Sequence, residues 1–230
     1  MSKELWWQLK KSIFHRVIRL SNAIFGKELL HRSRIARFLH VSWRNLFENI
    51  SPAHRRQARF EKANPDLPWL VPRAIREIEK QLKPDYVGFE WGSGRSTLWF
   101  ARQVAHITSV EGRRSWFENV SKMLAQKGLA HKVKIILSEV TTEHDFKSDE
   151  IERYAGTIDQ FEDHSFDFIV VDGHFREACL KSIGNKLRRR GILIVDNSDI
   201  LPNTWLDALL PYTSKKTWNN GIHETTIIYL

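Results

Sequence analysis

The sequence predicts an α/β domain with a mostly parallel sheet, preceded by a basic helical extension. Three observations support this fold class: short apolar runs alternate with helical segments, a glycine-rich turn follows the first of these runs, and charge is unevenly spread along the chain. Alternating strands and helices are typical of parallel strands joined by right-handed crossovers. The length of 230 residues suits one such domain plus an extension.

The expected elements follow one another in a regular order. A helix at 72–81 leads into strands at 86–90, 106–110, 133–137, 166–171 and 192–195, with helices at 96–103, 114–127 and 176–187 between them. Residues 143–163 are polar and acid-rich and predict a loop or a short helix. The chain ends differently, because Asn219-Asn220-Gly221 between residues 212–217 and 224–230 predicts an antiparallel hairpin.

The stretch from Tyr86 to Thr97 carries the strongest functional signal. An apolar run ends in Glu90, and Gly92-Ser93-Gly94 follows before the next predicted helix. Glycines let a backbone approach a ligand closely, and a helix start offers free N–H groups to an anion. A second acid, Glu111, closes the next apolar run about 20 residues after the loop, where a ribose-binding acid is expected. The pattern therefore predicts a site for an adenosine-containing cofactor.

These residues resemble the first two motifs of the class I S-adenosylmethionine (SAM)-dependent methyltransferases. The motifs are Glu90-x-Gly92-x-Gly94 and Ser109-Val110-Glu111, and two later segments, 168–173 and 191–197, agree in order and strand position. The resemblance covers residues 69–230 and implies a Rossmann-like fold that binds SAM. A Rossmann-like domain that binds another nucleotide, or none, is the alternative.

The resemblance also implies roles for individual residues. Glu90, Gly92, Ser93 and Gly94 would form the methionine end of the cofactor site, with Glu90 facing the amine directly or through water. Glu111 would accept both ribose hydroxyls as a bidentate acceptor.

Asp172 and the pair Asp196-Asn197 end neighbouring predicted strands. Strand ends border the ligand crevice of an open α/β sheet, and two carboxylates with an amide oxygen suit Mg²⁺. The trio resembles the metal site of the catechol O-methyltransferase type, which implies a metal that holds an acceptor hydroxyl in line with the sulfonium. The chain departs from that type at Phe175, where a lysine base would stand. Asp172 therefore has a second interpretation, as an acid that only faces the transferring methyl group.

His174 is the protein base expected in this region, because an imidazole of ordinary pKa can remove a proton near neutral pH. The alternative is a loop histidine that caps the following helix. His174 and Asp172 are thus the predicted catalytic residues. The expected reaction is methyl transfer to an oxygen of a small molecule or a glycan, driven mainly by alignment.

Two other functions are kept as alternatives. RNA methylation is supported only by the basic extension, and the lack of an Asn-Pro-Pro-Tyr-type motif argues against methylation of base nitrogens. A catalytically inactive SAM-fold binding protein is the other, and intact Glu90, Gly92, Gly94 and Glu111 count against it.

Residues 1–63 form the predicted extension and residues 64–230 the methyltransferase domain, with the boundary in the proline-marked stretch Asn64–Trp69. Residues 1–60 hold thirteen Lys or Arg and three Asp or Glu, which gives this segment a net charge of +10. The remaining residues have a net charge of −1, so the extension accounts for the whole positive charge of the chain, +9. Helices are expected at 4–25 and 28–47. The first is amphipathic, with Trp6, Leu9 and Ile13 among its apolar positions.

This first helix has two interpretations. It could lie on an anionic membrane surface, or it could pack on its own domain or on a second copy of the chain in a homodimer. No RNA or DNA module is recognisable, so nucleic acid is not an expected partner. The chain has a single cysteine, no apolar run long enough to span a membrane and no recognisable signal sequence. These features predict a cytoplasmic protein, which could also contact a membrane surface peripherally.

Overall fold

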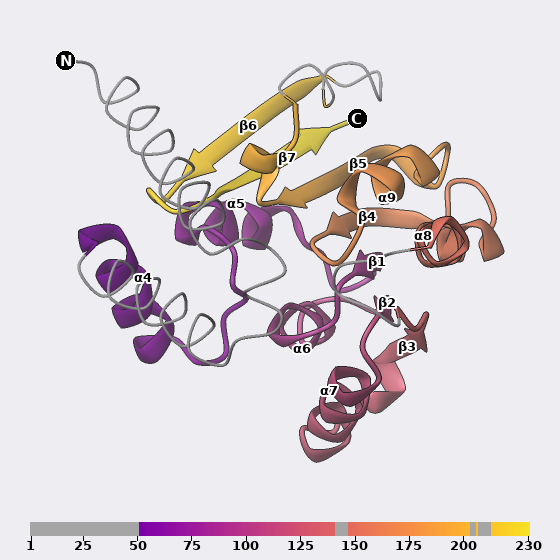
Figure 1. Cartoon of the computed structure of the whole chain (residues 1–230), viewed down its shortest axis with the longest axis horizontal. Helices are drawn as coiled ribbons and strands as arrows, with labels where there is room; N and C mark the ends of the chain where they lie inside the picture. Colours follow the sequence, from indigo (N-terminus) through magenta and orange to yellow (C-terminus); the bar gives the residue numbers. More distant parts are fainter. Residues whose placement is uncertain (1–50, 141–146, 203–205, 207–212) are drawn as a thin grey trace, which may run out of the picture. The chain divides into compact units, whose positions relative to one another are not determined.

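The computed structural model describes residues 51–140, 147–202, 206 and 213–230 (Figure 1). The chain divides into two units, Met1–Ala63 and Asn64–Leu230. In the first unit the described element is the helix α4 (Pro52–Ala63). The helices expected at 4–25 and 28–47 lie outside the described residues, so their roles stay predictions. Among the described helices, none is long and apolar enough to cross a membrane.

The second unit is built on a seven-stranded sheet. Its strands, in spatial order, are β3 (Val133–Leu137), β2 (His106–Glu111), β1 (Val87–Trp91), β4 (Phe166–Val171), β5 (Leu187–Asp196), β7 (Glu224–Tyr229) and β6 (Ser214–Asn219). The first five strands run parallel to one another, whereas β7 is antiparallel to both of its neighbours, β5 and β6. The predicted mostly parallel sheet with a terminal antiparallel hairpin is therefore confirmed.

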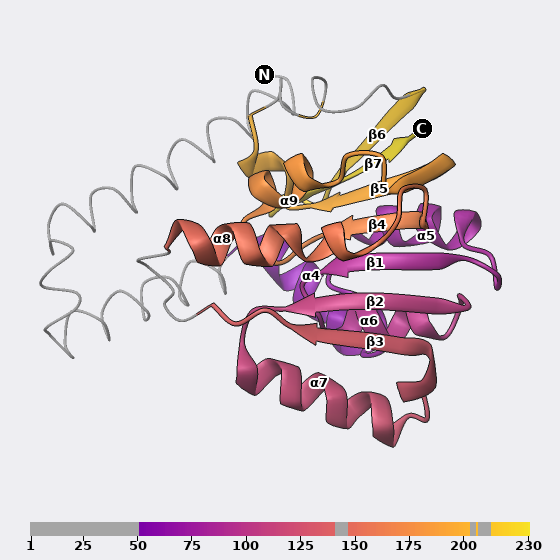
Figure 2. The same ribbon diagram turned by 90° about the vertical axis from the view of Figure 1, so that its right-hand side faces the viewer.

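Helices cover both faces of this sheet (Figure 2). On one face lie α5 (Pro72–Gln81) and α6 (Arg95–Ala101), and α7 (Arg114–Gln126) packs on β2 and β3. On the other lie α8 (Ser148–Ala155) and α9 (Arg176–Ser182), which contact each other. The described residues of the unit also include three short 3₁₀ segments: η1 (Ala130–Lys132), η2 (Gly156–Gln160) and η3 (Ser198–Ile200).

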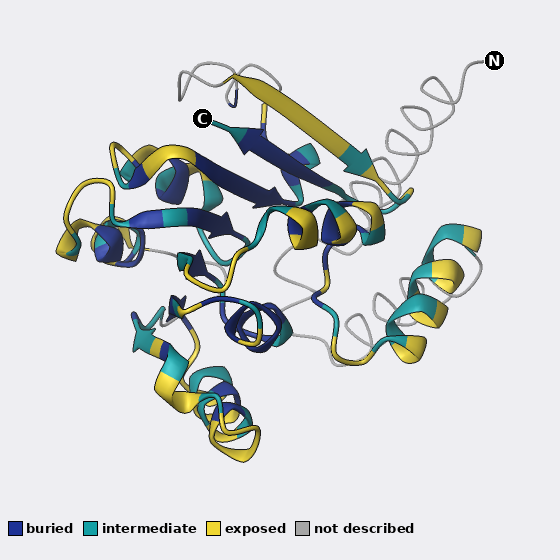
Figure 3. Ribbon diagram, turned by 180° about the vertical axis from the view of Figure 1, so that it is seen from behind, coloured by how far each residue is buried: buried dark blue, intermediate teal, exposed yellow. Residues whose placement is uncertain are grey.

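The main apolar core fills the layer between the sheet and the pair α8 and α9. Its aromatic members include Phe89, Trp91, Tyr154 and Phe166. Figure 3 shows the contrast at the hairpin, where β7 is buried and the edge strand β6 is exposed. Two lysines and other polar residues on β6 suit an edge strand, because charges oppose pairing with another sheet.

Several boundaries differ from the predictions. Helix α9 ends at Ser182 rather than near residue 187, and β5 begins at Leu187 rather than residue 192. Gly184 between them has a φ of +47°, a conformation that ends helices. Strand β6 starts two residues later than expected. The acid-rich segment contains the helix α8, one of its two predicted alternatives, because Tyr154 and Ala155 bury an apolar face there.

Candidate functional site

The ends of β1 and β4 are joined by a close backbone contact between two glycines. The carbonyl oxygen of Trp91 accepts hydrogen bonds from the N–H groups of Asp172 at 3.0 Å and of Gly173 at 2.8 Å. Gly92 has a φ of +95°, and a Cβ on it would lie 2.6 Å from the backbone nitrogen of Gly173. Both facts exclude a side chain. Gly92 is therefore required for the close approach of the β1 and β4 ends, in addition to its place in the glycine loop.

Gly94 serves the cavity beside the loop. Its φ of 166° is extended backbone that any residue adopts. The nearest atom to a Cβ built there is Nε1 of Trp116, at 3.8 Å, so the fold would tolerate a side chain. Because Gly94 lines the cavity, its missing side chain leaves room for a ligand.

The cavity at the loop has a volume of about 350 Å³. Besides Gly92, Ser93 and Gly94, its wall includes two tryptophans and several charged side chains, among them Trp69, Trp116, Arg95, Glu111, Asp172 and Arg176. The indole Nε1 of Trp116 donates to the carbonyl oxygen of Ser93 at 2.7 Å. The guanidinium of Arg95 lies 5.4 Å from the ring centre of Trp69, which is 51% exposed. Aromatic walls with a few convergent polar groups are typical of ligand sites.

Glu111 ends β2 and presents a partly engaged carboxylate to this cavity. Its Oε2 accepts hydrogen bonds from the hydroxyl of Ser93 at 2.6 Å and from the backbone N–H of Ser93 at 3.2 Å. Its Oε1 accepts from the backbone N–H of Arg113 at 2.8 Å. A carboxylate offers about four acceptor directions, so one is left, and rotation of the Ser93 hydroxyl would release another. Glu111 is therefore equipped to accept a ligand diol.

Glu90 lies on the adjacent strand and is sealed inside the protein. Its side chain is fully buried, does not line the cavity, and accepts hydrogen bonds from the hydroxyls of Ser96, Thr97 (2.6 Å) and Ser109 (2.8 Å). Burial raises the pKa of Glu90 to about 7, although the three hydroxyl donors oppose that shift. These hydrogen bonds tie α6 to β1 and β2, and the prediction that Glu90 faces the cofactor amine, directly or through water, stays untested.

Arg176 occupies the carboxyl ends of β4 and β5. Its Nη2 donates to Oδ1 of Asp172 and to Oδ1 of Asn197, both at 2.8 Å, and its Nε donates to the carbonyl oxygen of Asp196 at 3.0 Å. The side chain of Arg176 is 17% exposed and that of Asp172 is 32% exposed. Burial raises the pKa of Asp172, and the charge of Arg176 opposes that rise. One guanidinium thus joins the ends of two strands.

The residues predicted to bind magnesium do not fit a metal site here. Asp172 and Asn197 direct their oxygens to Arg176, and Oδ1 of Asp196 accepts a hydrogen bond from the Thr225 hydroxyl at 2.6 Å. In the described part of the chain, no group of three His, Cys, Asp or Glu side chains is arranged to hold a metal ion. The guanidinium of Arg176 therefore occupies the position in which the sequence predicts a magnesium ion. The magnesium prediction is therefore not supported.

Asp196 belongs to the β5–β7 contact and does not line the cavity. Its side chain is 4% exposed, and Nε2 of His223 lies 3.9 Å from its Oδ1. Burial, followed by the charge of Asp172, raises the pKa of Asp196. No role for His223 was predictable from its position in the chain, because the terminal hairpin brings it to the end of β5.

His174 lines the cavity but packs against the β2 side of it. A Cβ on Gly112 would lie 2.8 Å from Cδ2 of His174 and 3.1 Å from Cγ2 of Val140. The ring therefore closes on the residue that follows Glu111. His174 thus belongs to the wall of the cavity, and its predicted role as a base stays untested.

Tyr154 is a cavity residue that the sequence did not single out. Its side chain is fully buried, and its hydroxyl has no hydrogen-bond partner among the described residues. A Cβ on Gly173 would lie 2.1 Å from this hydroxyl, which places it at the contact between the two glycines. An unpaired buried hydroxyl is costly, and a polar ligand atom would satisfy it. Tyr154 was missed because it lies in the acid-rich segment that showed no strand or helix period.

Comparison with known proteins identifies the fold. No protein-family model and no curated protein matches the sequence. Among solved structures, the chain resembles a methyltransferase-like protein from Silicibacter pomeroyi, with 20% identity over 70% of this chain and 86% of that chain and a TM-score of 0.57. It also resembles a SAM-dependent O-methyltransferase from Thermotoga maritima, with 14% identity over 74% and 69% of the two chains and a TM-score of 0.51.

A third similar structure is precorrin 8W decarboxylase from Methanobacterium thermoautotrophicum, with 17% identity over 72% of this chain and 94% of that chain and a TM-score of 0.50. The chain thus has the Rossmann-like fold of class I methyltransferases, as its motifs predicted. Because a protein named a decarboxylase shares this fold, the fold alone does not fix the reaction.

Proposed function

We propose that the chain is a SAM-dependent methyltransferase that transfers a methyl group to an oxygen of a small molecule or a glycan. The observation that carries this proposal is Glu111, a buried carboxylate at the end of β2 that faces a cavity beside the glycine loop. An acid at this place in a Rossmann-like fold suits a ribose diol.

Three residues of the wall support SAM as the ligand. Glu111 would accept the two ribose hydroxyls after the Ser93 hydroxyl turns away from its Oε2. Gly94 leaves open space over the loop, and Tyr154 offers an unpaired hydroxyl to a polar ligand atom. Bound SAM would supply a methyl group on a positively charged sulfur, which is already an activated donor.

Because the donor is activated, the chain mainly has to align the two reactants. Asp172 and Arg176 line the cavity at the ends of β4 and β5 and are the residues we assign to the acceptor side. Their ion pair fixes both side chains. We assign His174 to the cofactor wall, since it closes on Gly112.

Calorimetric titration of the full chain with S-adenosylhomocysteine (SAH) tests the proposal. We expect saturable binding by the wild type. Glu111→Gln should weaken it about 10- to 100-fold, because hydrogen bonds to a charged group contribute about 1.5–3 kcal/mol. Glu139→Gln is the matched control, since this exposed acid pairs with Arg114 and does not line the cavity.

Other outcomes identify the alternatives. Clear binding of NAD with no heat from SAH would contradict the proposal and favour another nucleotide. Binding of SAH without consumption of SAM across a panel of hydroxylated and acidic acceptors would favour an inactive binding protein. Methylation of RNA fragments alone would favour the nucleic-acid alternative.

A further inference from the structure

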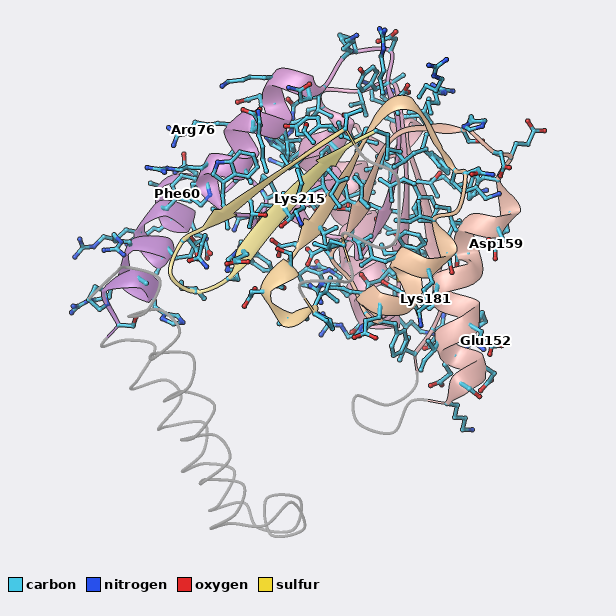
Figure 4. All side chains as sticks on the ribbon, turned by 90° about the horizontal axis from the view of Figure 1, so that it is seen from above. Phe60, Arg76, Glu152, Asp159, Lys181 and Lys215 are labelled. Carbon is cyan, nitrogen blue, oxygen red and sulfur yellow. The ribbon has the colours of Figure 1, made fainter. Side chains whose placement is uncertain are left out.

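A second cavity, of about 420 Å³, shares Arg176 with the first. Its wall comes from α8, α9 and η3, and five of its residues are apolar: Ile151, Phe175, Ala178, Ile200 and Leu201. Figure 4 labels Lys181 on α9, which also lines this cavity, and Glu152 on the neighbouring helix α8. The second cavity therefore combines an apolar surface with a cationic edge.

Each cavity has one large apolar side chain that stays exposed. Among the described residues, the large hydrophobic side chains that stay exposed are Trp69, at 51%, and Ile200, at 63%. Trp69 lines the first cavity and Ile200 lines the second. Single exposed apolar residues are ordinary on a protein surface, so Ile200 counts here as part of the apolar wall of the second cavity.

Arg176 has one nitrogen left for a ligand. Its Nε and Nη2 are engaged by the carbonyl of Asp196 and by the side chains of Asp172 and Asn197. No described residue accepts a hydrogen bond from Nη1. The two-nitrogen fork with which an arginine grips both oxygens of an anion is therefore unavailable. A bound anion would be held through a single oxygen.

We propose that the methyl acceptor is an apolar carboxylic acid that binds in the second cavity with one carboxylate oxygen on Nη1 of Arg176. The inference rests on the proposed function and names its substrate class. The hydrocarbon part contacts the apolar wall, and the N–H groups of Arg176 Nη1 donate to the carboxylate. Lys181 and Glu177 are the other charged residues of this wall.

Single-oxygen binding leaves the second carboxylate oxygen free to react. That oxygen forms a bond to the methyl carbon, the carbon–sulfur bond of SAM breaks, and its electron pair stays on sulfur. The products are a methyl ester and SAH. A carboxylic acid has a pKa of about 4 and is already ionised at neutral pH, so no proton has to be removed. The reaction therefore needs neither the magnesium ion nor the histidine base that the sequence predicted.

Octanoate is a suitable probe, and octanamide is its neutral counterpart of similar shape. With the full chain saturated with SAH, calorimetry should show binding of octanoate and at least tenfold weaker binding of octanamide. Arg176→Gln should weaken octanoate at least tenfold and leave octanamide unchanged. With SAM in place of SAH, mass spectrometry should detect methyl octanoate.

A second variant keeps the test independent of the ion-pair cluster. Ile200→Glu places a negative charge on an exposed residue of the second cavity. It should weaken octanoate at least tenfold without changing SAH binding, whereas Ile200→Gln should have a smaller effect.

The two proposals fail in different ways. If SAH binds but octanoate and 4-phenylbutyrate do not, or if 4-propylphenol is methylated while the acids are not, the carboxylic-acid inference is overturned and the methyltransferase proposal stands. If SAH itself does not bind, both are overturned.

Discussion

The ends of β1 and β2 differ in chemistry from the ends of β4 and β5. At the first pair, neutral hydroxyl and backbone donors surround two carboxylates, and one of them, Glu111, keeps acceptor capacity for a ligand. At the second pair, a guanidinium engages Asp172 and Asn197 and leaves them little capacity for a metal. An acid at a strand end is therefore a ligand group only where its neighbours leave it unsatisfied.

The same contrast separates the two acids of the first region. In the parallel register, Glu90 pairs with Ser109 and Trp91 pairs with Val110, so Glu111 lies one position beyond the last residue of β1. The segment beside Glu111 is therefore the glycine loop that follows β1, rather than β1 itself. Glu90 lies within the sheet and is covered by α6. A shift of two positions along a strand thus separates an interior carboxylate from a cavity carboxylate.

The largest expected effect separates the two glycines of the loop. Gly92→Ala should destabilise the fold by about 3 kcal/mol or more, because it combines a positive φ with a clash against the Gly173 backbone. Gly94→Ala should leave the free energy of unfolding within about 1 kcal/mol and still weaken SAH, since its methyl group enters the cavity. Urea unfolding and calorimetry measure the two effects. Equal stability losses would remove the distinction.

Glu90→Gln should change how stability depends on pH. The pKa of Glu90 rises on folding from an ordinary value of 4.5 to about 7. The contribution of Glu90 to the free energy of unfolding of the wild type should therefore fall by up to about 3 kcal/mol as the pH rises from about 4.5 to 7. Above about pH 7 this contribution should no longer change. Relative to the wild type, Glu90→Gln should gain about 2–3 kcal/mol between pH 5 and pH 8 in urea unfolding. If the free energies of unfolding of Glu90→Gln and the wild type differ by the same amount at pH 5 and pH 8, burial does not raise the pKa of Glu90.

Arg176→Gln should destabilise the protein by about 1–3 kcal/mol, because it leaves the partly buried Asp172 without its cation. The double variant with Asp172→Asn should recover part of this loss, and a double-mutant cycle measures the coupling. EDTA or added MgCl₂ should leave the melting temperature of the wild type unchanged. A melting temperature that falls when EDTA is added would support the metal site that the sequence predicted.

Much of the fold was predictable, because its signals are local. Apolar runs marked the parallel strands, Asn219-Asn220-Gly221 marked the terminal turn, and acids marked the strand ends. The exceptions were places where tertiary contacts override a local pattern. Strand β5 extends back to Leu187 because it pairs with Phe166, and the acid-rich segment forms α8 because Tyr154 packs into the core.

The candidate site was predictable in outline but not in its partners. The sequence located the glycine loop, Glu111 and the strand ends at Asp172 and Asn197. It could not show that Arg176 turns back from α9 to join two strands, because its partner Asn197 is 21 residues away. Nor could it show that Ser96, Thr97 and Ser109 all donate to Glu90. The available signal was the pair Ser96 and Thr97, which follow Glu90 closely in the sequence, whereas Ser109 lies on the next strand.

The most direct test compares SAH binding by Glu90→Gln and Glu111→Gln in parallel titrations of the full chain. Both variants replace a carboxylate with an amide at the end of adjacent strands. We expect Glu111→Gln to lose about 10- to 100-fold in affinity and Glu90→Gln to stay within about threefold of the wild type, since Glu90 does not reach the cavity. Loss of SAH binding by Glu90→Gln, with Glu111→Gln unaffected, would contradict this assignment of the two acids.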